Sequence, residues 1–268
     1  MRNDNLKKHS TINQYKNMIE VKNLSKSFAT KSGPFEVLHN ISFEVPANSL
    51  AIIYGPSGSG KSTLLNVLSA LEPPTSGQVW IAGQDVYKLN ADQRSFFRAQ
   101  NMGIVHQENY WIKSLNVLEN VAMPLYLSGS QKSSALAVAK DSLDKVGMGN
   151  YSNHSPSVLS GGQQQRVSMA RALVASPNLI LADEPTGNLD SNNGKMIIDL
   201  LTYLQHDLKR TIILVTHNIE YLPLSTIQLY MRDGKLTATH PGQKIPTEIA
   251  NSLKNQLDAL IKLERAHA

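Results

Sequence analysis

The chain has 268 residues, of which 41% are hydrophobic and 18% are charged, and its formal net charge is +5. These proportions are typical of a globular protein that buries one large core, with room for an inserted lobe. The basic residues are scattered along the chain, so no specific nucleic-acid partner is expected. The chain contains no cysteine, which excludes disulfides, thiolate metal sites and thiol catalysis.

The apolar runs are too short to cross a membrane. Runs such as 179–182 and 211–215 have the length of strands, whereas a spanning helix needs about 18 apolar residues. The N-terminal residues lack the apolar stretch of a secretory signal, so we expect no export of the chain. Residues 1–17 are polar and without periodicity, which predicts a mobile tail before a domain that begins near Met18.

The first part of the domain alternates or runs apolar with many β-branched residues. This pattern predicts strands between residues 18 and 55, separated by turns at Gly33-Pro34 and at Pro46. From about residue 90 to 157 the pattern changes, and the four apolar residues of one helical face have helical spacing: Leu136, Ala139, Leu143 and Val146. We therefore expect a helical lobe inserted into an α/β core.

Helices and strands alternate in the last part of the domain. The predicted order is a helix at 161–175, a strand at 179–182, a helix at 191–208 and a strand at 211–216, which favours a parallel, doubly wound sheet. Residues 246–268 carry apolar residues three or four apart, namely Ile249, Leu253, Leu257 and Leu260, which predicts an amphipathic helix. We expect this helix to pack on its own domain, and a role in assembly is the alternative.

A glycine loop joins a predicted strand to a predicted helix and matches G-x-x-x-x-G-K-[ST]. Glycines let backbone N–H groups converge on phosphate oxygens, and the helix start presents its positive dipole end to them. Lys61 would reach the β- and γ-phosphates, and Ser62 would ligate magnesium. The predicted nucleotide-binding residues here are Gly55, Pro56, Ser57, Gly58, Ser59, Gly60, Lys61, Ser62 and Thr63. The competing interpretation is a glycine-rich turn with a surface lysine.

Two acids follow the apolar strand at 179–182. Such carboxylates emerge at the carboxyl edge of the sheet, where open α/β folds bind ligands, and this edge also holds Lys61. We assign Asp183 to magnesium and Glu184 to the attacking water as general base. Alone the pair is a weak signal, since acids also commonly end strands.

The run Leu159-Ser160-Gly161-Gly162-Gln163 opens the next predicted helix, and the serine and glycine amides form a second anion-binding helix start. This run resembles the signature of the ATP-binding cassette ATPases. The resemblance implies that Ser160, Gly161, Gly162 and Gln163 close over ATP held by a second copy, so that a dimer encloses two nucleotides. It also implies the fold, a phosphate-loop α/β cassette with an N-terminal antiparallel part.

Other motifs of that family follow in order across residues 18–237. Gln107 matches the lid glutamine that joins magnesium to the helical lobe, Asp190 belongs to a loop that crosses the dimer interface, and His217 matches the switch histidine at the γ-phosphate. Phe28 matches the aromatic residue on which adenine stacks, with core packing as the competing interpretation. The helix at 159–175 would be the signature helix, and residues 238–268 would be an extension.

The chain is similar to the lipoprotein-releasing, macrolide-exporting and cell-division group of that family, above all in Pro185-Thr-Gly-Asn-Leu-Asp190. This resemblance implies separate membrane-spanning permease subunits, with a periplasmic adaptor as a further candidate partner, and a cassette on the inner face of the cytoplasmic membrane. The DNA-repair and translation-factor branches need a coiled coil, zinc-binding cysteines or a second cassette, which this sequence lacks. A regulatory cell-division ATPase remains an alternative.

The sequence departs from the group after Gln107, where it reads Glu-Asn-Tyr-Trp-Ile-Lys in place of a leucine-rich stretch. In the family this stretch faces the membrane subunit. We therefore expect an atypical partner. Asn48-Ser49 also replaces the usual glycine-glutamate before the phosphate-loop strand, and this change is expected to affect a turn alone.

Overall fold

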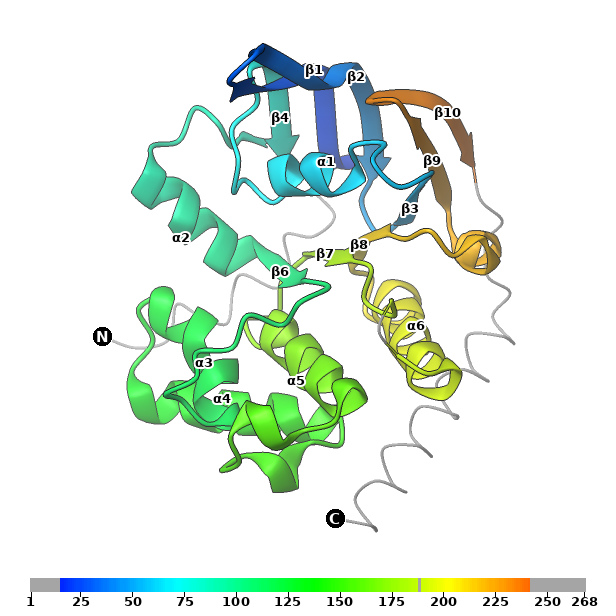
Figure 1. The fold of residues 1–268 in the computed structure, drawn as a ribbon. Coiled ribbons are helices and arrows are strands. Elements are labelled where there is room, and N and C mark those ends of the chain that lie inside the picture. The colour runs from blue at the N-terminus through cyan, green and yellow to red at the C-terminus, as the bar shows by residue number, and fades with distance from the viewer. Residues whose placement is uncertain (1–14, 188, 242–268) are drawn as a thin grey trace.

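A computed structural model describes residues 15–187 and 189–241, which form two sheets and a group of helices (Figure 1). The antiparallel sheet has the order β2-β1-β4-β5 and consists of β1 (Asn17–Thr30), β2 (Gly33–Pro46), β4 (Ser76–Ile81) and β5 (Gln84–Asp85). The second sheet has the order β10-β9-β3-β8-β7-β6 and consists of β3 (Leu50–Tyr54), β6 (Met102–Val105), β7 (Leu179–Asp183), β8 (Thr211–Val215), β9 (Ile227–Arg232) and β10 (Lys235–Pro241).

The second sheet is parallel except at one edge, where β10 pairs antiparallel with β9. Its central strands are buried on both faces, which explains their unbroken apolar sequence. Successive residues point to different cores: Leu50 and Ile52 join one apolar cluster, whereas Ala51 and Ile53 join the other. The predicted α/β fold with a mostly parallel core sheet and an antiparallel part is confirmed.

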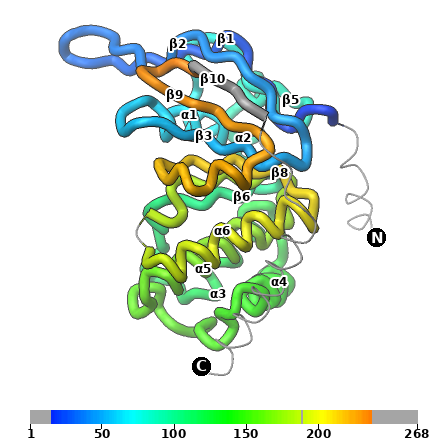
Figure 2. Tube along the Cα trace, turned by 90° about the vertical axis from the view of Figure 1, so that its right-hand side faces the viewer, coloured from blue at the N-terminus to red at the C-terminus, as the bar shows by residue number. Residues whose placement is uncertain are grey.

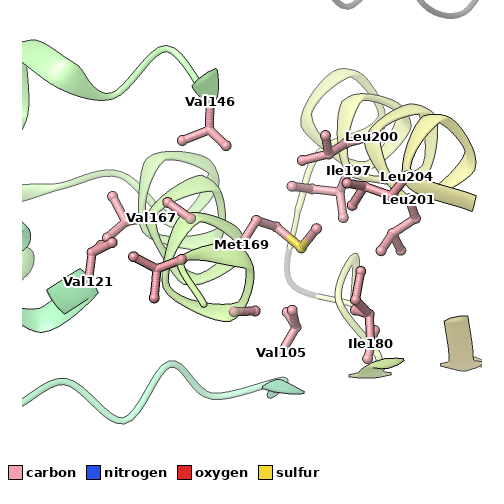
Figure 3. Close-up of a cluster of buried hydrophobic side chains, with 14 of the residues drawn as sticks. Val105, Val121, Val146, Val167, Met169, Ile180, Ile197, Leu200, Leu201 and Leu204 are labelled. Atoms are coloured by element: carbon pink, nitrogen blue, oxygen red, sulfur yellow. The ribbon is translucent and has the colours of Figure 1, made fainter. Parts of the chain in front are cut away.

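Each face of the parallel sheet has its own cover. On one face lie α1 (Lys61–Leu68) and the antiparallel sheet, whose apolar residues share a cluster with β3, β7 and β8. On the other face lie α5 (Gly161–Leu173) and α6 (Ser191–His206). Figure 3 shows Met169 of α5 between Val105 and the leucines of α6, above Ile180 of the sheet.

The helical lobe contains α3 (Val117–Leu127) and α4 (Lys132–Lys145), which pack on each other and on α5. Two short 3-10 helices, Gly149–Tyr151 and Pro156–Val158, lead from α4 to α5, and a third, Ile219–Leu224, precedes β9. In both views the lobe lies at the opposite end of the molecule from β1 and β2 (Figures 1 and 2). The apolar face predicted here is confirmed: Ala139, Leu143 and Val146 are buried, and Leu136 is partly buried against the same core cluster.

Several predicted boundaries differ from the structure. Residues 90–157 are not all helical lobe, because after α2 (Ala91–Asn101) the strand β6 pairs parallel with β7 and belongs to the core sheet. The predicted domain end at 237 falls inside β10. At the other end, β1 begins at Asn17, and the carbonyl of Lys16 accepts a hydrogen bond from the amide of Ala47 at 3.1 Å. Residues 1–14 of the predicted tail and the predicted helix at 246–268 lie outside the described residues.

Within the described ranges no helix is long and apolar enough to span a bilayer.

Candidate active site

The glycine loop between β3 and α1 adopts backbone conformations that residues with a side chain rarely adopt. Gly55, Gly58 and Gly60 all have positive φ, at 150°, 78° and 96°. A Cβ on Gly55 would lie 2.0 Å from the carbonyl oxygen of Met231 in β9, so this position has no room for a side chain. The following helix α1 begins at Lys61 with no side-chain cap from the described residues. Its first amides are therefore open to an anion.

Gly58, Gly60 and Lys61 line a hollow of about 420 Å³ at the carboxyl end of the parallel strands. The hollow brings together residues from motifs far apart in the sequence, namely Ser57, Gly58, Gly60, Lys61, Ser62, Thr63, Gln107, Glu184 and His217. Lys61 is buried, and its ammonium group donates to the loop carbonyls of Gly55 at 2.9 Å and Pro56 at 2.8 Å. The Ser59 hydroxyl is also buried and has no hydrogen-bond partner in the described part of the chain.

The two acids at the end of β7 have different surroundings. The Ser62 hydroxyl donates to Asp183 Oδ1 at 3.5 Å, and burial raises the pKa of the Asp183 carboxyl. Glu184 has a left-handed backbone, with φ 44°, and its Oε1 lies 2.9 Å from Nδ1 of His217. Its other oxygen, Oε2, is buried and finds no hydrogen-bond partner among the described residues. Glu184 therefore has one oxygen held by His217 and one available for a ligand.

The signature lies on a different element from the phosphate loop. Ser160 caps α5: its hydroxyl accepts from the amide of Gln163 at 3.3 Å, and the Gln163 side chain accepts from the amide of Ser160 at 2.9 Å. Gly162 is buried against the side chain of Asn193. Neither Ser160, Gly162 nor Gln163 lines the hollow at Lys61. Gly161 reaches a smaller hollow of about 260 Å³ that it shares with Gln107 and Glu184.

Two other predicted residues stand apart from the hollow at Lys61. Asp190 caps α6: its carboxylate accepts from the backbone amides of Asn192 and Asn193 and from the side chain of Asn193. The two hydrogen bonds from Asn193 lower the pKa of the Asp190 carboxyl. Phe28, on β1, is 37% exposed, so it does not pack in the core. The ammonium nitrogen of Lys26 lies 4.8 Å from the centroid of the Phe28 ring.

Sequence reasoning missed a second group of residues around the segment that follows Gln107. Arg171 and Gln164 of α5 bind this segment, and the buried Asn120 of α3 holds its far end. The atypical Trp111 was the one visible signal, because its indole N–H requires a partner when it is buried. Beside the segment lies an apolar hollow of about 850 Å³, lined in part by Phe96, Tyr110 and Leu127.

Comparison with known families supports the motif assignments. The model of the family described as "ABC transporter" matches residues 38–187, which is more than half of the chain. The chain belongs to the ABC transporter family. It is thus an ATP-binding cassette, and the phosphate loop and the acids after β7 both lie inside the matched range.

Individual relatives of this cassette agree. It is 41% identical, over 220 residues, to the lipoprotein-releasing system ATP-binding protein LolD of Pseudoalteromonas translucida, and the match covers 82% of this chain and 95% of LolD. Among solved structures it is similar to MJ0796, described as a bacterial ABC transporter cassette in a dimeric structure, with a TM-score of 0.79 and 35% identity over 85% of this chain and 100% of that one. It is also similar to a second dimeric structure of MJ0796, in a post-hydrolysis state bound to ADP and Pi, with a TM-score of 0.79 and 34% identity over 85% of this chain and 100% of that one.

Proposed function

We propose that this cassette hydrolyses ATP, with magnesium, between two copies of the chain, and that hydrolysis drives separate membrane-spanning subunits. The observation that carries the proposal is the single hollow in which Lys61, Glu184 and His217 meet the open start of α1. Cation, carboxylate and imidazole come there from three elements, and phosphoryl transfer to water depends on charge neutralisation and on a group that positions the attacking water.

The phosphate loop is built to bind a polyphosphate. The glycine amides and the first turn of α1 offer N–H donors, and Gly58 and Gly60 line the hollow without a side chain of their own. Lys61 donates to the carbonyls of Gly55 and Pro56, and these hydrogen bonds hold its charged group against the loop. We assign Phe28 to the adenine, because its ring is exposed and an aromatic face stacks on any base.

Three oxygen donors fit a magnesium ion: the Ser62 hydroxyl, the Asp183 carboxylate and the Gln107 side-chain amide. Such hard donors suit Mg²⁺, which is usually held jointly by few protein groups and by substrate phosphates. Accordingly, the described residues contain no group of three or more His, Cys, Asp or Glu side chains that could hold a metal alone. When bound, the ion would neutralise developing charge on the phosphate oxygens.

Glu184 is the general base in this proposal. Its unpaired Oε2 would accept the proton of the attacking water, while His217 holds Oε1 and so fixes the direction of the carboxylate. The left-handed backbone of Glu184 turns the chain sharply after β7 and keeps the side chain at the hollow.

The second copy would supply the signature. Ser160 and the first amides of α5 form an anion site that lies apart from the hollow of the same chain, and the similar cassette MJ0796 is dimeric. We infer that Ser160, Gly161 and Gly162 meet the γ-phosphate bound by the partner copy, with Gln163 holding the capped turn in shape and Asp190 crossing at the interface.

The membrane subunits would dock at the apolar hollow beside Tyr110 and Leu127, which offers a helix a largely carbon surface. The cassette would then lie on the inner face of the cytoplasmic membrane. Because LolD is named as part of a lipoprotein-releasing system, we propose work on a lipid-modified protein or a similar cargo in preference to a regulatory cell-division role. The periplasmic adaptor remains a prediction.

The test is phosphate release by the purified chain with ATP and magnesium. We expect turnover that chelation of magnesium abolishes, and a loss of about 100-fold or more for Lys61→Ala. Lys88→Ala is the matched control, since Lys88 is an exposed lysine that pairs with Asp85 away from the hollow. Equal turnover of the two lysine variants would refute the assignment of the site.

A further inference from the structure

The segment after Gln107 is held by the signature helix α5. The Arg171 guanidinium donates to the carbonyl of Asn109 at 2.6 Å and to that of Tyr110 at 3.3 Å. The same group lies 4.5 Å from the ring centroid of Trp111. Burial lowers the pKa of Arg171 to about 10, so the group is still charged at neutral pH. One side chain of α5 thus fixes three consecutive residues of the segment.

Trp111 continues the connection to the signature itself. Its indole N–H donates to Gln164 Oε1 at 2.8 Å, and Gln164 Nε2 donates to the carbonyl of Leu159 at 3.1 Å. Leu159 immediately precedes Ser160, the cap of α5. Two hydrogen bonds therefore join Trp111 to the residue before the signature serine.

Tyr110, which precedes Trp111, lines the apolar hollow, whereas Trp111 does not. Tyr110 is 67% exposed and lines the apolar hollow of about 850 Å³, and its ring meets that of His106 edge-on at 5.3 Å. Its φ of 43° is left-handed, which turns the chain sharply between Tyr110 and Trp111. Of these two adjacent residues, Tyr110 lines the apolar hollow and Trp111 contacts the signature helix α5.

The segment is also fixed beyond Trp111. The buried side chain of Asn120 accepts from the amide of Ile112 at 2.9 Å and donates to the carbonyls of Ile112 and Leu115 at 3.2 and 3.0 Å. With Arg171 on one side and Asn120 on the other, Trp111 has little freedom to move independently of α5 and α3. A partner that displaced Tyr110 would therefore also act on Trp111, because the same side chain of α5 binds both residues.

We propose that Trp111 is a positioning residue for hydrolysis: through Gln164 it sets the orientation of Ser160 according to what contacts Tyr110 in the apolar hollow. The inference rests on the proposed function, because the orientation of Ser160 matters when that residue meets the nucleotide of a partner copy. Trp111 does not line the hollow at Lys61, so its effect is on turnover and not on the first binding of ATP.

Trp111→Phe tests the indole N–H, because phenylalanine retains an aromatic face over Arg171 and loses the donor. We expect turnover at saturating ATP to fall by about 5- to 30-fold, as for a lost hydrogen bond that leaves a polar partner unsatisfied. The affinity of a fluorescent ATP analogue for the monomer should stay unchanged. Trp80→Phe is the matched control, because the Trp80 indole nitrogen has no hydrogen-bond partner among the described residues.

Gln164→Met cuts the same connection from the other side and reports on it even if Trp111→Phe fails to fold. We expect a loss at least as large, because Gln164→Met also removes the hydrogen bond to the carbonyl of Leu159. Adding Trp111→Phe to Gln164→Met should cause no further loss, since the hydrogen bond that Trp111→Phe removes is already absent. Turnover of Trp111→Phe and Gln164→Met equal to that of Trp80→Phe, or losses that multiply in the double variant, would overturn the inference. Absence of turnover in the unchanged chain would instead overturn the proposed function.

Discussion

At the residue scale, Glu184 is the most constrained position of the site. It combines a left-handed φ of 44°, a buried Oε2 without a hydrogen-bond partner in the described part of the chain, and a contact of 2.9 Å between Oε1 and His217. A left-handed non-glycine residue and an unpaired buried oxygen each cost about 1–3 kcal/mol, so neither favours the fold. Both are expected where a carboxylate is kept ready for a ligand.

Glu184→Gln should bind ATP and magnesium but hydrolyse ATP about 100- to 10,000-fold more slowly, because the amide keeps the size of the side chain and loses the base. Single-turnover phosphate release is the measurement. Glu20→Gln serves as the control, since Glu20 pairs with Lys22 on the antiparallel sheet, away from the hollow. Turnover of Glu184→Gln near that of the control would remove Glu184 from the catalytic role.

Asp183 gives a prediction on stability. Burial raises the pKa of its carboxyl, so the folded chain holds this proton more tightly than the unfolded chain does. As pH rises from the unfolded pKa through the raised folded pKa, ionisation of Asp183 lowers the free energy of unfolding. Asp183→Asn should therefore melt up to a few degrees higher than the unchanged protein at neutral pH without nucleotide, while its ATPase activity falls. A lower melting temperature than that of the unchanged protein would contradict this account.

At the element scale, the sequence predicts best where one local cause decides. The strands β7 and β8 are apolar except for Asp183 and Thr211 at their ends and are buried on both faces, and the phosphate loop is dictated by its glycines. By contrast, β6 has four residues, and the local sequence places it inside the helical lobe. That prediction is wrong because the place of β6 is decided by pairing with β7, which lies far along the chain. The course of residues 108–116 likewise depends on two residues outside this segment. Arg171 lies far along the chain on α5, and Asn120 lies on the following helix α3.

Asn120→Ala tests the role of that buried amide. It should lower the free energy of unfolding by about 1–3 kcal/mol, because the amide of Ile112 and nearby carbonyls lose their partner. Urea unfolding followed by circular dichroism gives the value, and the exposed Asn153→Ala is the matched control. Equal midpoints for the two variants would show that water satisfies this loop without Asn120.

At the scale of the whole molecule, the motifs predicted to bind the nucleotide are divided between two places in the chain. Lys61, Glu184 and His217 share one hollow, whereas Ser160 opens α5 elsewhere and does not line that hollow. The sequence predicted this separation through the family resemblance, and not from spacing, because strand order and helix packing decide which motifs meet within one chain. Under the proposed function, a nucleotide bound at Lys61 therefore meets the signature of a second copy.

The absence of cysteine allows a direct measurement of this claim. Ser59 is buried, with 2% exposure, so Ser57 is the better position in the phosphate loop. One copy carries Ser160→Cys and another Ser57→Cys, both with Glu184→Gln to prevent hydrolysis, so that any link must join two chains. With ATP and a short bifunctional crosslinker, the account predicts a crosslinked dimer that ADP does not produce. No crosslink between the two copies while ATP is demonstrably bound to both would contradict it.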